Sequence, residues 1–217
     1  LRSCSPVLVA REVLDLLRER AASKGLALAL SIDGELPSLI TTDSLRFRQI
    51  LLNLAGNAIK FTPSGSVTIR LQHDAAHSLL VADVCDTGIG ISKEQEARLF
   101  ASFSQAEAST ARLYGGTGLG LTISRKLADL LGGSVTLHAT GPQGSTFRVA
   151  IATGPLDEHV EFVNDSTVAA SLRLCTKEAV PPQPASDLTG VRLLLAEDGP
   201  DNQRLIGFVL RKAGATV

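Results

Sequence analysis

The chain contains no methionine, no tryptophan and only one tyrosine, Tyr114. Apolar residues nevertheless make up 44% of it and charged residues 20%, which is typical of a globular protein. A hydrophobic core is therefore expected, built mainly from Leu, Val, Ile and Ala. The length of 217 residues suits one domain of ordinary size plus an additional segment.

An excess of basic charge is also missing. The 21 Lys and Arg residues nearly balance the 22 Asp and Glu residues, for a formal net charge of -1. No positive field is available to attract nucleic acid or an anionic membrane, so neither is expected as a partner. Cys4, Cys85 and Cys175 are odd in number and far apart, which favours neither a disulfide framework nor a zinc site. The expected location is the cytoplasm.

Long apolar runs are absent as well. No stretch approaches the roughly 18 residues needed to cross a bilayer, and no signal peptide pattern is present. The sequence begins at Leu1 without Met and stops at Val217 just after a strand-like Ala-Thr-Val. Both ends are therefore expected to be cut from a longer protein, whose missing N-terminal region leaves room for a membrane anchor.

Helical and strand-like periodicities alternate up to about residue 152. One helix is expected from Pro6 to near Gly25, where glycine suits a left-handed helix end, and a second from Asp43 or Ser44 to Phe61. Ser92 and Gln95 form a capping-box pattern for a short third helix. A further helix is expected over residues 119–131, and strands over residues 26–32, 67–71, 80–84, 134–138 and 146–151.

Beyond residue 152 the periodicity decays. Residues 153–190 include Pro181-Pro-Gln-Pro184 and are expected to be a linker with at most one short strand near Ser171–Leu174. A new unit is expected over residues 191–217, where an apolar run ends in Glu197-Asp198. The predicted organisation is thus a domain over residues 1–152, a linker, and a short C-terminal unit.

Three polar side chains recur on one face of the second expected helix. Asn53, Asn57 and Lys60 follow Gln49 at helical spacing. Asparagine is a poor helix former, so its repetition in an otherwise apolar helix needs a reason. The pattern alone leaves two readings open: a solvated stripe, or a carboxamide pair with a lysine that faces magnesium and phosphate.

Two glycine-rich segments follow this helix. Asp86-Thr-Gly-Ile-Gly90 comes directly after an expected strand, and Gly115-Gly-Thr-Gly-Leu-Gly120 comes directly before an expected helix. The free amides and positive end of a helix N-terminus suit phosphate groups. Glycine also lets the backbone approach a ligand closely. Taken singly, the first segment is more often an ordinary turn, whereas the loop reading of the second has little weight because Gly116, Gly118 and Gly120 recur at steps of two beside a helix N-terminus.

Together and in this order, the three motifs resemble the ATP-binding catalytic domain of sensor histidine kinases. Residues 46–62 closely match the N box, residues 86–90 the G1 box and residues 115–120 the G2 box of that family. The resemblance extends over about residues 1–152. It also includes Phe100 and Phe103 as the F box, Ser104–Tyr114 as the ATP lid and Gly144-Ser-Thr-Phe147 as the last glycine box.

The resemblance implies the Bergerat-type ATP-binding fold, an α/β (α+β) two-layer sandwich with a mixed sheet and helices on one face. It implies that Asn57 ligates Mg²⁺ through its amide oxygen, that Lys60 neutralises phosphate and that Asp86 accepts the adenine amino group. The implied catalytic residues are Asn53, Asn57, Lys60 and Arg112. The implied ATP-binding residues are Asn53, Asn57, Lys60, Phe61, Asp86, Gly88, Gly90, Ile91, Phe100, Gly116, Thr117, Gly118, Leu119, Gly120 and Ser145.

The implied reaction is transfer of the γ-phosphoryl group of Mg-ATP to a histidine. None of the four histidines of the chain is followed by the pattern of the phosphoacceptor histidine, so the acceptor is expected on a dimerisation domain of the same parent protein. One alternative is a hydrolytic ATPase of the same superfamily, but those enzymes have a glutamate general base where this chain has Asn53. A non-catalytic nucleotide-dependent interaction module is the other alternative.

The C-terminal unit resembles the first strand and helix of a response-regulator receiver domain. A kinase that carries such a domain is a hybrid sensor kinase, so a receiver domain or a response regulator is an expected partner. Glu197 and Asp198 would hold Mg²⁺ there, although only in a complete receiver. Residues 191–217 are too few for a receiver and lack its phosphoaccepting aspartate.

Overall fold

The computed structural model describes residues 1–97, 99, 120–157, 159–167, 190–194, 210–211 and 213–216. The chain divides into two units, Leu1–Val168 and Ala169–Val217. All of the described helices longer than one turn belong to the first unit.

A five-stranded mixed sheet forms one layer of the first unit, in the order β2-β5-β6-β8-β7. Only β2 and β5 run parallel, and the other neighbours are antiparallel. The strands are β2 (Ala27–Asp33), β5 (Ser66–Asp74), β6 (Leu79–Asp86), β7 (Ser134–Gly141) and β8 (Gly144–Ala152). Every strand predicted from alternation is present within a few residues.

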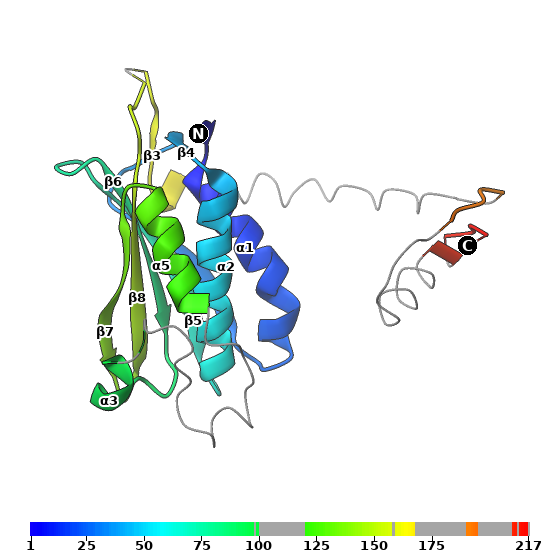
Figure 1. Cartoon of the computed structure of the whole chain (residues 1–217), viewed down its shortest axis with the longest axis horizontal. Helices are drawn as coiled ribbons and strands as arrows, with labels where there is room; N and C mark the ends of the chain where they lie inside the picture. Colours follow the sequence, from blue (N-terminus) through cyan, green and yellow to red (C-terminus); the bar gives the residue numbers. More distant parts are fainter. Residues whose placement is uncertain are drawn as a thin grey trace. The chain divides into compact units, whose positions relative to one another are not determined.

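Three helices form the second layer and stand side by side on one face of the sheet, with α2 between α1 and α5 (Figure 1). They are α1 (Pro6–Ala22), α2 (Ser44–Phe61) and α5 (Gly120–Leu130). The core lies between the two layers, where alternate residues of β5, such as Val67, Ile69 and Leu71, are fully buried. The predicted sandwich with a mixed sheet and helices on one face is confirmed.

Local sequence accounts for where α2 begins and ends. Asp43 caps the first turn by accepting hydrogen bonds from the backbone of Leu45 and Arg46, each at 3.1 Å. Pro63 disfavours a helical conformation at Thr62, which is extended. A shorter helix, α3 (Lys93–Glu96), has the capping box predicted from Ser92 and Gln95.

Four short strands were not predicted: β1 (Arg2–Cys4), β3 (Leu36–Pro37), β4 (Ile40–Thr42) and β9 (Phe162–Val163). β1 pairs with β4, and β3 pairs with β9. The backbone of Ile32 also donates to the carboxylate of Asp165 at 3.0 Å. The first part of the expected linker over residues 153–190 therefore belongs to the first unit, which extends to Val168. The strand expected near Ser171–Leu174 lies outside the described residues.

The described part of the second unit contains one parallel backbone pairing, between Arg192 and Thr216. Leu193 donates to the Thr216 carbonyl at 2.8 Å, and Thr216 donates to the Val191 carbonyl at 2.9 Å. Within this described part, Leu194 is 97% exposed.

Candidate nucleotide-binding site

The polar face of α2 is set by the same periodicity that buries its opposite side. Asn53, Asn57 and Lys60 are all half-buried, whereas Gln49 is exposed. The apolar side packs into the core through Phe47, Ile50, Leu51, Leu54, Ala55, Ala58 and Ile59. The three side chains singled out from the sequence thus share a partly sheltered surface.

Asn53 connects α2 to the first turns of α5. Its Nδ2 donates to Oγ of the buried Ser124 at 2.8 Å. A Cβ atom added to Gly120 would lie only 2.4 Å from Asn53 Oδ1. Glycine at position 120 therefore lets the start of α5, the positive end of that helix dipole, approach the polar face of α2.

Lys60 lies near the C-terminal end of the same face. Its Nζ is 4.8 Å from the centroid of the Phe61 ring. Burial, and to a smaller extent the charge of Arg20, lower the pKa of the Lys60 ammonium group. A bound anion would offset both effects, so this position suits a phosphate group.

Asp86 ends β6 and is held by two backbone amides. Its Oδ1 accepts from Gly88 N at 2.8 Å and from Ser145 N at 3.2 Å. Burial raises the pKa of the Asp86 carboxyl group, and the two amide hydrogen bonds act in the opposite direction. Because both bonds go to Oδ1, Oδ2 is placed to accept from an amino group of a ligand.

The glycines beside Asp86 are required by close backbone approaches. A Cβ at Gly88 would lie 2.5 Å from the Phe61 carbonyl oxygen, and one at Gly144 would lie 1.9 Å from the Asp86 carbonyl oxygen. Gly90 has φ +72°, and a Cβ at this position would come similarly close to the Gly141 carbonyl oxygen. The end of α2, the 86–90 loop and the start of β8 are thereby packed together.

Two residues at this site were not anticipated from the sequence. Ser124, the partner of Asn53, follows Gly120 by one helical turn, and that spacing is the only signal that could have indicated it. Thr140 accepts from the backbone of Ile91 at 2.9 Å and hydrogen-bonds the Ser145 hydroxyl at 3.0 Å. It links two predicted ligand residues, and nothing in its sequence context predicts this.

Several predicted site residues lie outside the described part of the chain. They are Phe100, Arg112, Gly116, Thr117, Gly118, Leu119, Glu197 and Asp198, together with Phe103 and the whole of the predicted lid. Their roles stay predictions.

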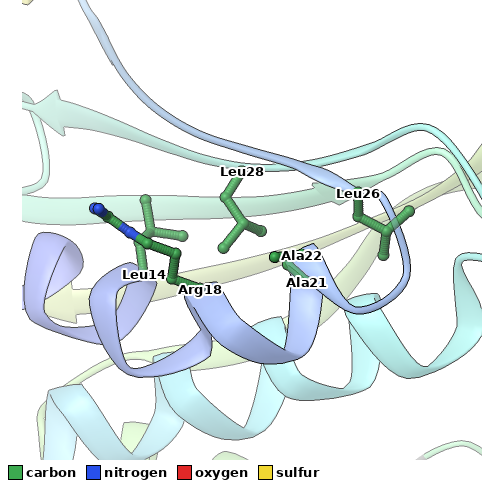
Figure 2. Close-up of a pocket in the computed structure, with 6 residues that line it drawn as sticks. All are labelled: Leu14, Arg18, Ala21, Ala22, Leu26 and Leu28. Atoms are coloured by element: carbon green, nitrogen blue, oxygen red, sulfur yellow. The ribbon is translucent and has the colours of Figure 1, made fainter.

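A separate hollow of about 270 Å³ lies between α1 and β2 (Figure 2). Its lining consists of Leu14, Arg18, Ala21, Ala22, Leu26 and Leu28. None of the predicted nucleotide-binding residues lines it. The polar face of α2 and this hollow are therefore different features of the first unit.

Among the described residues, no cluster of three or more His, Cys, Asp or Glu side chains could hold a metal ion. The described helices likewise include none with the length and apolar character to cross a bilayer.

The mixed sheet, the covering helices and the polar face beside a helix N-terminus together define an ATP-binding domain. Residues 42–155 match the family described as "Histidine kinase-, DNA gyrase B-, and HSP90-like ATPase", and the chain belongs to this family. The resemblance inferred from the three motifs is confirmed at this level.

Relatives of this chain include signal transduction histidine kinases. The chain is 44% identical over 139 residues to the signal transduction histidine-protein kinase BarA of Escherichia coli, covering 63% of this chain and 15% of the relative. It is 46% identical over 134 residues to hybrid signal transduction histidine kinase B of Dictyostelium discoideum, covering 60% of this chain and 7% of the relative. It thus spans a small part of the length of either protein.

Solved structures give the same assignment. Full-length ShkA in complex with AMPPNP matches with a TM-score of 0.59 and 29% identity, covering 96% of this chain and 38% of that one. The N box and the glycine boxes predicted a catalytic ATP-binding domain of the histidine kinase type. That prediction is therefore confirmed.

Proposed function

We propose that this domain binds Mg-ATP and provides the nucleotide for transfer of the γ-phosphoryl group to a histidine on a separate dimerisation domain of the parent protein. One observation carries the choice of kinase over hydrolase. The face of α2 that meets the N-terminus of α5 carries carboxamides, and α2 contains no Asp or Glu. A carboxamide cannot take a proton from water, so water is a poor nucleophile at this site.

The residue roles follow from chemistry and position. Oδ2 of Asp86 accepts a hydrogen bond from the adenine amino group. Gly88 and Gly90 let the backbone approach the base, next to Phe61, Ile91 and Ser145. Lys60 and the amides at the start of α5 neutralise the phosphates. Arg112 and the lid residues are proposed to contribute to this neutralisation. That part of the proposal depends only on the resemblance to sensor histidine kinases.

Magnesium is compatible with the residues present. Mg²⁺ commonly uses one or two protein oxygen ligands and takes the rest from water and substrate phosphates. The Asn57 amide oxygen is a suitable hard donor on the polar face of α2, which explains how a site without a carboxylate cluster fits the ion. When bound, Mg²⁺ held by Asn57 would supply neutralisation of the phosphate charge.

The partners follow from the relatives. We infer that this domain acts on a histidine-containing dimerisation domain and, through it, on a receiver domain or response regulator. Residues 191–217 are proposed to be the first part of a receiver, a role supported by the parallel pairing of Arg192 with Thr216, since parallel strands need a crossover connection. Because its nucleotide is ATP, the domain is proposed to act in the cytoplasm.

Calorimetric titration tests the site. The parent chain should bind Mg-ATP and release little phosphate. Asn57→Ala should weaken binding of Mg-ATP about tenfold or more, the size of one lost charge-assisted contact, while adenosine binding changes little. Gln72→Ala, on the face of the sheet opposite the helices, is the matched control. Equal affinities in all three proteins would remove Asn57 from the site, and rapid phosphate release by the parent would favour the hydrolase.

A further inference from the structure

Helix α2 ends without the usual glycine cap. The last four carbonyl groups of any helix lack partners inside it. Thr62, which follows α2, is extended and precedes Pro63, so the chain cannot turn back to cap these carbonyls. In α2 they belong to Ala58, Ile59, Lys60 and Phe61.

Groups from outside the helix satisfy all four. The Thr62 hydroxyl donates to the Ala58 carbonyl at 2.6 Å. Lys24 Nζ donates to the carbonyls of Ile59 at 2.8 Å and Lys60 at 2.9 Å. The backbone of Ile89, inside the 86–90 loop, donates to the Phe61 carbonyl at 3.3 Å.

Lys24 makes a third contact, to the Thr62 carbonyl at 3.4 Å. An ammonium group has three donors, so these contacts use all of them. Its positive charge also lies at the negative end of the α2 dipole. Lys24 is an exposed residue that caps α2 from another part of the chain.

The turn after α1 fixes the position of Lys24. Leu26 N donates to the Ala21 carbonyl and Gly25 N to the Ala22 carbonyl, each at 3.0 Å. Gly25 has φ +67°, so these bonds form the left-handed helix end predicted from the sequence. The cap is therefore held by a rigid turn.

We propose that Lys24 is a positioning residue for nucleotide binding. It acts through the end of α2, which carries Lys60 and touches the 86–90 loop through Phe61 and Ile89. Without it, the Ile59 and Lys60 carbonyls lose their partner, the last turn of α2 frays, and Lys60 shifts relative to Asp86. This inference rests on the proposed function, which assigns Lys60 and Asp86 to opposite ends of ATP.

Three substitutions in the full chain test the proposal. Lys24→Met keeps the length of the side chain and removes the donors. Lys24→Arg keeps the charge and the donors. Lys126→Met removes an exposed lysine of α5 and controls for the loss of one positive charge.

The first readout is hydrogen exchange at the Ile89 amide, with β5 and β8 as internal references. The second is the calorimetric affinity for Mg-ATP compared with that for adenosine. Lys24→Met should speed exchange at Ile89 and weaken Mg-ATP binding about tenfold, with a smaller loss of adenosine affinity, because Asp86 itself is anchored by the sheet while the loop beside it loosens. Lys24→Arg should restore both values.

The proposal would be overturned if Lys24→Met gave the same exchange rate at Ile89 and the same affinities as Lys126→Met. Equal losses of affinity for Mg-ATP and adenosine, with faster hydrogen exchange throughout the sheet, would overturn it as well. Such a result would indicate a purely structural role for Lys24. A parent chain that binds no Mg-ATP would refute the proposed function instead. Exchange at Ile89 would then still decide whether Lys24 holds the loop.

Discussion

At the scale of single residues, Asp86 combines a cost in stability with a role in binding. Its carboxylate is partly buried and accepts from the amides of Gly88 and Ser145, yet its pKa is raised because burial outweighs those bonds. The folded protein therefore holds a proton on Asp86 more tightly than the unfolded chain does. The ionised form is retained, on this account, because ATP needs it.

Asp86→Asn should weaken ATP binding by about 1.5 to 3 kcal/mol, the range for a charge-assisted hydrogen bond. Its melting temperature at neutral pH should equal or exceed that of the parent, because Asn can keep both amide hydrogen bonds without a buried charge. Calorimetry and thermal unfolding measure the two effects. Unchanged affinity would remove Asp86 from the site.

The pH dependence of stability follows from the same raised pKa. The contribution of Asp86 to stability is complete below the pKa of the unfolded carboxyl group and is lost as pH rises through the higher folded pKa. The melting temperature of the parent should therefore fall relative to Asp86→Asn as pH increases across this window. A constant difference between the two proteins from acid to neutral pH would contradict this.

Asn53→Glu tests why the site favours transfer over hydrolysis. The substitution places a carboxylate next to the N-terminus of α5, within reach of the Ser124 hydroxyl. Phosphate release should rise, and by less than the roughly 10² to 10⁴-fold of a well-placed general base, because the close approach of Gly120 leaves little space for a longer side chain. A colorimetric phosphate assay that finds no increase would mean that position 53 is out of reach of the attacking water.

At the scale of elements, one ion pair joins two neighbouring strands of the sheet. Arg148 on β8 contacts Asp83 on β6 through two hydrogen bonds, of 2.8 and 2.7 Å, and the two residues are register partners. The Asp83 side chain is 5% exposed, so water does little to solvate its carboxylate, and Arg148 supplies the balancing positive charge. The pair therefore joins the strand that ends in Asp86 to the strand that begins with Gly144 and Ser145.

Arg148→Met should destabilise the fold by about 3 kcal/mol, because it leaves a buried carboxylate without its cation. Adding Asp83→Leu should recover most of that loss, since apolar residues can replace a buried pair. Denaturant unfolding of both proteins measures the difference. A double variant no more stable than Arg148→Met alone would show that stability depends on the ion pair itself and not on the unpaired charge of Asp83.

The sequence predicted those elements whose signals are local. The bounds of α2 follow from Asp43 and Pro63, and α3 follows from its capping box. The four short strands were missed because each has two or three residues and exists only through pairing, as Leu36 does with Val163. Similarly, the glycine boxes are readable as motifs, whereas the contacts of Lys24, Ser124 and Thr140 depend on tertiary packing.

At the scale of the whole molecule, the described candidate ligands all lie in the unit Leu1–Val168. Removing residues 169–217 should therefore leave Mg-ATP affinity within about twofold, because no described candidate ligand lies among them. Calorimetry on the shortened and full chains measures this. A large loss of affinity would mean that the second unit contributes to the nucleotide site.

We propose above that this domain supplies the γ-phosphoryl group of ATP to a histidine on another domain. The most direct test combines the chain, γ-labelled radioactive ATP, Mg²⁺ and the histidine-containing dimerisation domain of its parent protein as a separate chain. We expect acid-labile, alkali-stable label on that domain, and none when Asn57→Ala replaces the parent chain or when the acceptor histidine is substituted. ATP binding without any labelled histidine would contradict it and identify a nucleotide-dependent interaction module instead.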